Sequence, residues 1–247
     1  MIKSKIIFVA SFLLFFAVSA FAQRPSSKIS AVFGDITQKY FAKIDSIRND
    51  RNDLTYEDLG LSVNPKKDSI HNGHTYVDLG LSVKWATCNV GTYNPEYPGM
   101  HYAWGETTPK VSYNESNSKT AGVNMGDISG NPNYDVARAT WGGTWRLPTI
   151  EEFKELIQCC TWTWTTLKGR KGYKVTSRRN GNSIFLPAAG EHKDSSLNYA
   201  GSEGIYWSSS PYNSHSYLAS VILFSSSECD TGWGSRYFGF SVRAVCE

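Results

Sequence analysis

The sequence lacks the short motifs by which most catalytic and nucleic-acid-binding sites are recognised. Its five histidines show no metal-ligand spacing, and it contains neither a Gly-x-Ser-x-Gly nucleophile elbow nor a Walker loop for phosphate. No nucleic-acid-binding motif is present, and the formal net charge is only +3. These absences argue against the common hydrolase, nucleotide-binding and nucleic-acid-binding classes, and the sequence predicts no cofactor and no bound metal.

Long apolar runs are also scarce, because the chain has a single one, residues 6–18. Lys3 and Lys5 precede this run, and Ala20-Phe21-Ala22 follows it as a small-x-small cleavage site, which is the pattern of a secretory signal. The run is too short to span a bilayer. We therefore expect residues 1–22 to be a signal peptide and no transmembrane segment to remain. The mature chain would be exported to the periplasm, the cell surface or the extracellular space, with a net charge of +3 − 2 = +1.

The first mature segment, residues 23–54, has the pattern of an amphipathic helix. Its apolar residues recur at spacings of three and four, which places them on one helical face. These residues are Ile29, Val32, Phe33, Ile36, Tyr40, Ile44 and Ile47. Such a face needs a partner, which is either the domain that follows or a second chain. Self-association through residues 24–54 is therefore one alternative.

An internal repeat follows the helical segment. Residues 55–63, TYEDLGLSV, recur as residues 75–83, TYVDLGLSV, with one difference. The second copy continues into Trp85 and Cys88, and we expect it to be the native strand. The first copy runs into Asn64-Pro65, so we interpret residues 55–73 as a linker with a partial strand repeat. A leucine-rich solenoid is the alternative, but two copies are too few to build one.

The rest of the chain is organised around a turn-and-helix segment at residues 141–153, WGGTWRLPTIEEF. Gly142 and Gly143 allow backbone conformations that other residues disfavour, and Pro148 ends a short extended piece. Thr149 and Glu152 have the spacing of a capping box, in which each side chain bonds the backbone amide of the other residue. This segment therefore predicts the start of a helix.

Several segments in order resemble a known family. DVARATWGGTWRLPTIEEF, from Asp135, is similar to the signature of the formylglycine-generating-enzyme branch of the C-type-lectin fold. The wider set, including HTYVDLGLSVKWATCNVG, HYAWGET, NGNSIFLPAAG, YWSSS and GFSVRAV, resembles the Fibrobacter succinogenes major paralogous domain of secreted Bacteroidetes proteins over residues 74–247. The resemblance implies an α+β domain of C-type-lectin-like type, with a twisted, mostly antiparallel sheet and a few short helices. Its motif residues here are Asp135, Trp141, Trp145, Arg146, Pro148, Thr149 and Glu152.

Turn signals predict further elements in the domain. Asn180-Gly181 indicates a hairpin between β-branched and aromatic runs, and residues 205–209, 217–224 and 236–245 are three more strand candidates. Residues 89–134 are predicted to be mostly loop, with Tyr102 and Trp104 entering the core. Four oxygen-bearing residues in this region offer a weak calcium-loop alternative, although side chains of these types usually cap backbone in turns. They are Asp127, Asn131, Asn133 and Asp135.

Five cysteines in an exported protein leave at least one unpaired, and the sequence alone leaves the pairing open. The resemblance favours a bridge between Cys88 and Cys160, and Cys229 and Cys246 are candidates for a second. The formylglycine-generating relatives bind copper through two cysteines a few residues apart near the carboxyl terminus. Here Cys229 and Cys246 are 246 − 229 = 17 positions apart. The oxidase activity is therefore not carried over, and it remains only an alternative.

Residues 206–236 are rich in the residue types that recognition surfaces use. Tyr and Trp give large contact areas, and Ser, Asn and Asp give adaptable hydrogen bonds. We therefore predict an exported, non-catalytic recognition or adhesion module that binds a glycan or a protein; a scaffold oligomerised by its amino-terminal helix is a further alternative. The competing interpretation places the aromatic residues in the core, with Trp207, Phe238 and Phe240 as members. The candidate ligand residues are Tyr212, Asn213, His215, Tyr217, Asp230, Trp233, Ser235, Arg236 and Tyr237.

Overall fold

The computed structural model describes residues 70–213 and 215–247. The predicted signal peptide, the amphipathic helix of residues 23–54 and the first repeat copy lie outside the described residues. In the described part, no helix is both long enough and apolar enough to cross a membrane.

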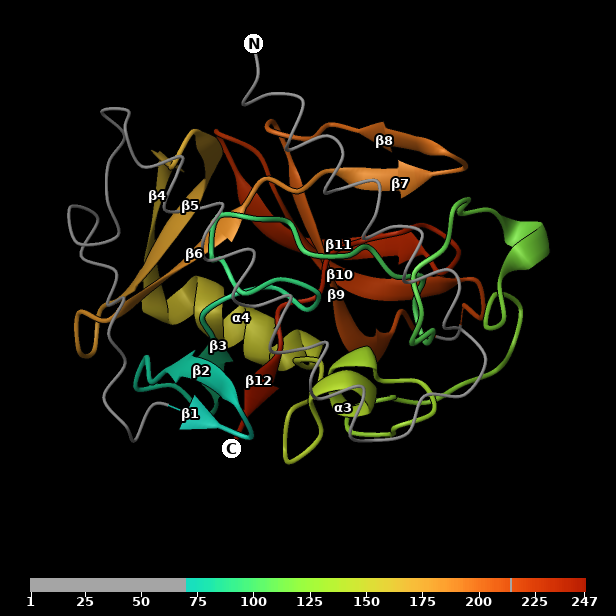
Figure 1. The fold of residues 1–247 in the computed structure, drawn as a ribbon, viewed down its shortest axis with the longest axis horizontal. Coiled ribbons are helices and arrows are strands. Elements are labelled where there is room, and N and C mark those ends of the chain that lie inside the picture. Colours follow the sequence, from blue (N-terminus) through green and yellow to red (C-terminus); the bar gives the residue numbers. More distant parts are fainter. Residues whose placement is uncertain (1–69, 214) are drawn as a thin grey trace, which may run out of the picture. The chain divides into compact units, whose positions relative to one another are not determined.

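The described chain consists mostly of antiparallel strands with few helices, as the α+β prediction expects at this coarse level (Figure 1). One sheet has the order β1-β2-β3-β12, formed by Ile70–His71, His74–Val77, Lys84–Ala86 and Val245–Cys246. A second has the order β4-β5-β6, formed by Cys160–Leu167, Arg170–Ser177 and Ser183–Pro187. A third has the order β11-β10-β9, formed by Cys229–Ser235, Leu218–Phe224 and Gly204–Pro211. A small hairpin, β7-β8, is formed by Glu191–Lys193 and Ser196–Asn198; the helices are α3 (Val136–Trp141), α4 (Ile150–Cys159) and the 3-10 turn η2 (Glu115–Asn117).

The two ends of the described chain meet in the first sheet. β12 pairs with β3 through Val245 and Trp85, and Val245 also bridges Arg146. In Figure 1 the red β12 accordingly lies beside the teal β3. The carboxyl-terminal strand therefore closes the domain against its first strands.

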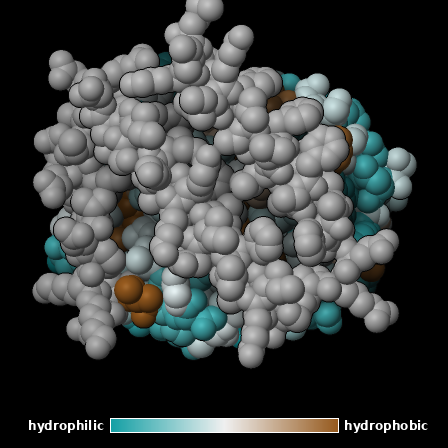
Figure 2. Space-filling view, in the orientation of Figure 1, coloured by the Kyte–Doolittle hydropathy of each residue, from teal (hydrophilic) through white to brown (hydrophobic). Residues whose placement is uncertain are grey.

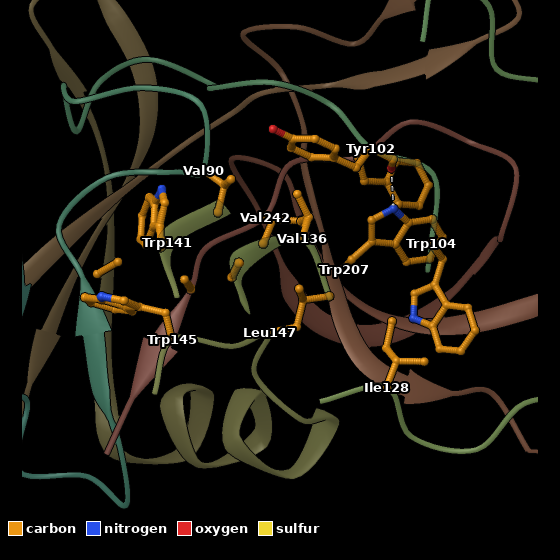
Figure 3. Close-up of a cluster of buried hydrophobic side chains, with 14 of the residues drawn as sticks. Val90, Tyr102, Trp104, Ile128, Val136, Trp141, Trp145, Leu147, Trp207 and Val242 are labelled. Atoms are coloured by element: carbon orange, nitrogen blue, oxygen red, sulfur yellow. Dashed lines mark hydrogen bonds between the residues drawn. The ribbon is translucent and has the colours of Figure 1, made fainter. Parts of the chain in front are cut away.

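The central strand β10 separates two hydrophobic core clusters. Because successive strand residues point to opposite faces, Val221 enters the first cluster and Ile222 enters the second. The first cluster includes Trp104 and Trp207, and the second includes Phe153. Figure 3 shows the first cluster, in which the Trp207 indole donates to the carbonyl oxygen of Tyr102 at 2.7 Å. Tyr102 and Trp104 are buried, as predicted.

Helix α4 starts at the predicted capping box. The Glu152 amide donates to the Thr149 hydroxyl at 3.3 Å, and the Thr149 amide donates to the Glu152 carboxylate at 2.8 Å. The guanidinium of Arg146 adds two bonds to the Glu152 carboxylate, at 2.6 and 2.9 Å. The helix buries Phe153 and Leu156 in the second cluster. The cap therefore fixes the direction of a helix that packs on this cluster.

Replacing Thr149 with alanine should lower the free energy of unfolding by about 1 kcal/mol, since the Glu152 amide loses its acceptor. Chemical denaturation measures this loss. Thr149→Ser keeps the hydroxyl and should retain nearly all of the wild-type stability. Equal losses in the two variants would contradict a role for the cap.

The predicted Asn180-Gly181 hairpin is confirmed. β5 and β6 pair antiparallel, with Val175 opposite Ile184, and Gly181 has a φ of +77°. A second Asn-Gly turn, Asn72-Gly73, joins β1 to β2, where the sequence analysis placed a linker. The linker assignment is therefore wrong for residues 70–73. The Asn72-Gly73 pair is the same kind of turn signal as Asn180-Gly181, and it indicates this hairpin.

The last predicted strand is wrong. Residues 236–245 form isolated bridges at Gly239, Phe240 and Ser241 in place of a continuous strand, and only the last of them, Val245, belongs to a strand, β12. β11 lies earlier in the chain. β11 contains Gly232 and Gly234, and glycine residues in a segment favour the prediction of a loop. A side chain at Gly234 would lie 2.4 Å from the Phe240 ring, and one at Gly232 would lie 2.6 Å from Leu223. Packing against the buried Phe240 ring therefore requires glycine at position 234, whereas the exposed Leu223 side chain beside position 232 could move.

The second repeat copy is a strand only in part. Thr75 to Val77 belong to β2, and the chain then turns through Gly80, whose φ is +67°. Leu79 and Val83 are nevertheless buried in the second cluster. The prediction of a native element is thus confirmed for its first residues, whereas the remainder packs as a turn.

All five cysteines are free, which contradicts both predicted disulfides. Cys88 and Cys246 lie in the first core cluster, whereas Cys160 lies in the second and Cys229 packs against the second. Each predicted pair therefore joins residues of different clusters. Burial raises the pKa of Cys160 and Cys246 to about 11 and that of Cys229 to about 12, so these thiols are protonated at neutral pH.

Candidate ligand-binding surface

Three of the candidate ligand residues form one aromatic group. The ring centroid of Tyr212 lies 6.4 Å from that of His215 and 6.2 Å from that of Trp233. Trp233 is 56% exposed, in contrast to the buried Trp207. We call Tyr212, His215 and Trp233 the aromatic group; they offer a partly exposed, largely apolar surface to a ligand.

Two elements bring these rings together. Tyr212 and His215 lie in the connection between β9 and β10, and the His215 amide donates to the Tyr212 carbonyl oxygen at 3.2 Å. Trp233 lies on β11, opposite Ser220 of β10. Among the described strands β11 pairs only with β10, so it is an edge strand of this sheet. The edge position explains how a tryptophan in a strand stays open to solvent.

Arg236 was predicted to bind ligand, and the structure contradicts this. Its side chain is buried, and its guanidinium carbon lies 4.3 Å from the centre of the Trp104 ring. The guanidinium donates to the carbonyl oxygens of Leu218 at 3.1 Å, Thr120 at 3.2 Å and Val123 at 2.7 Å. Arg236 therefore joins the loop at residues 120–123 to the start of β10, and burial lowers its pKa.

The remaining candidates lie around the aromatic group without joining its ring contacts. Tyr217 is 48% exposed, and its hydroxyl would lie 3.0 Å from a side chain at Gly122. Asn213 is an exposed turn residue with a φ of +47°. The others are Ser235, which is half-buried, Asp230, which is exposed, and Tyr237, whose ring packs edge-on against Phe238. Because strand residues alternate in direction, Asp230 points to the face of β11 opposite to Trp233.

The calcium alternative fails because its two carboxylates already bond protein groups. Asp135 is fully buried and accepts four backbone amides, those of Gly130, Leu147, Ala137 and Arg138, at 2.8 to 3.1 Å. Burial raises its pKa, while these amides act in the opposite direction. Asp127 accepts the hydroxyls of Ser209 and Ser210 and the amide of Ser129. In the described residues no group of three or more His, Cys, Asp or Glu side chains is placed to hold a metal ion.

Two histidines that were not predicted to lie together, the buried His101 and the half-buried His192, form a pair. The rings of His101 and His192 lie 4.8 Å apart, and Tyr113 stacks on His192 at 5.5 Å. Burial lowers the pKa of His101 to about 4 and also lowers that of His192, so both rings are neutral at pH 7. Their distance along the chain left no local signal for the pair.

Part of the surface of the described chain is polar. In Figure 2, the described atoms along the right-hand edge, where the green helical turn η2 lies in Figure 1, are mainly hydrophilic.

No family model, curated protein or solved structure matches this chain. Its function is therefore inferred from the aromatic group and its surroundings. The resemblance to the paralogous domain stays a prediction from sequence motifs.

Proposed function

We propose that the chain is an exported, non-catalytic recognition module that binds a glycan or a protein through the aromatic group. The observation that carries the proposal is the Trp233 ring, more than half exposed and 6.2 Å from Tyr212. Burying such rings against a ligand releases water from a large apolar area, and tryptophan and tyrosine are the residues on which binding energy concentrates.

The paired strand that carries Trp233 supports this proposal. β11 pairs with β10 along its whole length, and the buried Arg236 binds the loop at residues 120–123. A pre-organised surface loses less conformational entropy on binding than a mobile one. The mostly antiparallel architecture, closed by β12 against β3, is also consistent with the C-type-lectin-like fold that we propose on the sequence motifs.

The oxidase alternative receives less support from the cysteines. Cys246 is buried in the first core cluster, whereas Cys229 packs against the second. A copper site of the kind found in the formylglycine-generating relatives needs two thiolates at one metal. We therefore propose binding as the main function.

Trp233→Ala and Tyr212→Ala should each weaken ligand binding at least tenfold, which corresponds to the loss of about 1.4 kcal/mol expected for a central aromatic contact. The mature chain, residues 23–247, would be screened on glycan and protein arrays, and each hit measured by titration. Tyr134→Ala is the matched control, because Tyr134 is an exposed aromatic residue outside the aromatic group. If every hit binds both variants as tightly as the wild type, the aromatic group is not the binding surface.

A further inference from the structure

The second repeat copy, residues 75–83, fills a slot built by three parts of the domain. Its first part pairs with β3, with Tyr76 opposite Ala86 and Val77 opposite Trp85. The turn between β5 and β6 then binds the next backbone carbonyl oxygen. That of Asp78 accepts from the side-chain amides of Asn180 at 3.0 Å and Asn182 at 2.8 Å. These contacts are made to backbone atoms, so any sequence with the same backbone conformation could form them.

Further along the slot, the contacts are specific to residue type. The carbonyl oxygen of Leu79 accepts the Ser177 hydroxyl at 2.6 Å, and the Leu79 side chain is fully buried. Gly80 adopts a φ of +67°, which favours glycine. The amide and hydroxyl of Ser82 donate to the Glu155 carboxylate at 3.0 and 2.5 Å. A segment that occupies this slot therefore needs leucine, glycine and serine at these spacings.

The first repeat copy meets all of these requirements. Residues 55–63 carry Leu59, Gly60 and Ser62 at the positions of Leu79, Gly80 and Ser82, and the copies differ only where Glu57 replaces Val77. Val77 is half-buried at the margin of the second cluster, so a glutamate there has partial access to water.

We propose that residues 55–63 are an alternative occupant of the slot that residues 75–83 fill. In the exchanged state residue 63 takes the place of residue 83. Residues 64–83, which are 83 − 63 = 20 residues, then form a loop that returns to Lys84 and Trp85. The entropic cost of closing such a loop rises only slowly with its length. The inference is independent of the ligand proposed above.

Three features keep the second copy as the major occupant. It leads into Trp85 without a loop, Val77 packs at the margin of the core, and the His74 ring stacks on Trp141 with centroids 4.0 Å apart. The first copy has Leu54 at the position of His74 and Glu57 at the position of Val77. Val77→Glu should therefore raise the share of the exchanged state.

Thiol crosslinking in the full-length mature chain tests the exchange. Glu155→Cys is combined with Ser62→Cys in one protein and with Ser82→Cys in the other, and Cys159→Ser and Cys229→Ser remove the partly exposed native thiols. A short bifunctional reagent should join positions 82 and 155 in most molecules. It should also join positions 62 and 155 in a minority of monomers, and Val77→Glu should increase that fraction severalfold. The proposal is overturned if the 62–155 product is absent, or occurs only in dimers, while the 82–155 product forms.

A stability cycle provides a second readout. Leu79→Ala damages only the second copy, so exchange to the intact first copy should limit its effect on the denaturation midpoint. Leu59→Ala alone should leave the midpoint almost unchanged, and the double variant should lose more than the sum of the two single losses. Additive losses would show that the first copy cannot replace the second, even if the crosslinking variants fold poorly.

Discussion

Asp135→Ala should lower the free energy of unfolding by about 4 kcal/mol. The carboxylate accepts four backbone amides, two of which begin α3 and two of which belong to Gly130 and Leu147. Each buried amide that loses its acceptor costs about 1 to 3 kcal/mol, and part of this is recovered where water enters the space. One side chain thus joins a loop, a helix start and the segment that leads to α4.

Chemical denaturation of Asp135→Ala, with Asp127→Ala as the control variant, measures this loss. Asp127 also caps a turn, but it is exposed, so its removal should cost about 1 kcal/mol or less. Similar losses of unfolding free energy in the two variants would show that burial does not determine how much the Asp135 hydrogen bonds contribute to stability.

Acidification should remove about 3 kcal/mol of stability through His101. Its pKa is about 4 in the folded protein, because burial disfavours the charged ring, against an ordinary value of 6.5. Between these values the unfolded chain binds a proton that the folded chain does not, so stability rises with pH through this window. The contribution is complete above about pH 6.5 and is lost as the pH falls towards 4, at about 1.4 kcal/mol per pH unit.

His101→Gln separates this effect from the titration of carboxylates. The glutamine amide can still donate to the Ala189 carbonyl oxygen, which the His101 ring approaches at 3.2 Å, but it does not titrate. Denaturation at pH 4, 5, 6 and 7 should therefore show a shallower loss in the variant. An identical pH dependence in both proteins would exclude His101 as its source.

Elements with local signals could be predicted from the sequence. The α4 start follows from Thr149 and Glu152, and the β5–β6 turn follows from Asn180-Gly181, because in both cases the stabilising groups lie within a few residues. The Asn72-Gly73 hairpin has the same kind of signal. β11 has no such local signal, because its glycines lie against side chains that pack on the strand from other elements.

The candidate surface could be predicted only in part. Its region and the aromatic character of Tyr212 and Trp233 follow from composition, whereas the burial of Arg236 does not. A guanidinium bonded to three carbonyl oxygens and stacked on Trp104 depends on segments distant in the chain. The cysteine pairing failed for the same reason, since β10 divides the core into two clusters.

By itself the sequence determined where the capped helix begins, where the chain makes its Asn180-Gly181 turn and that Tyr102 and Trp104 are buried. Only the tertiary structure decided that Trp233 faces solvent while Trp207 does not, that Arg236 is internal, and that each predicted cysteine pair is split between clusters. Caps and turns are stabilised by atoms a few residues apart. Exposure instead depends on which distant elements pack against a side chain, and no short stretch of sequence contains that information.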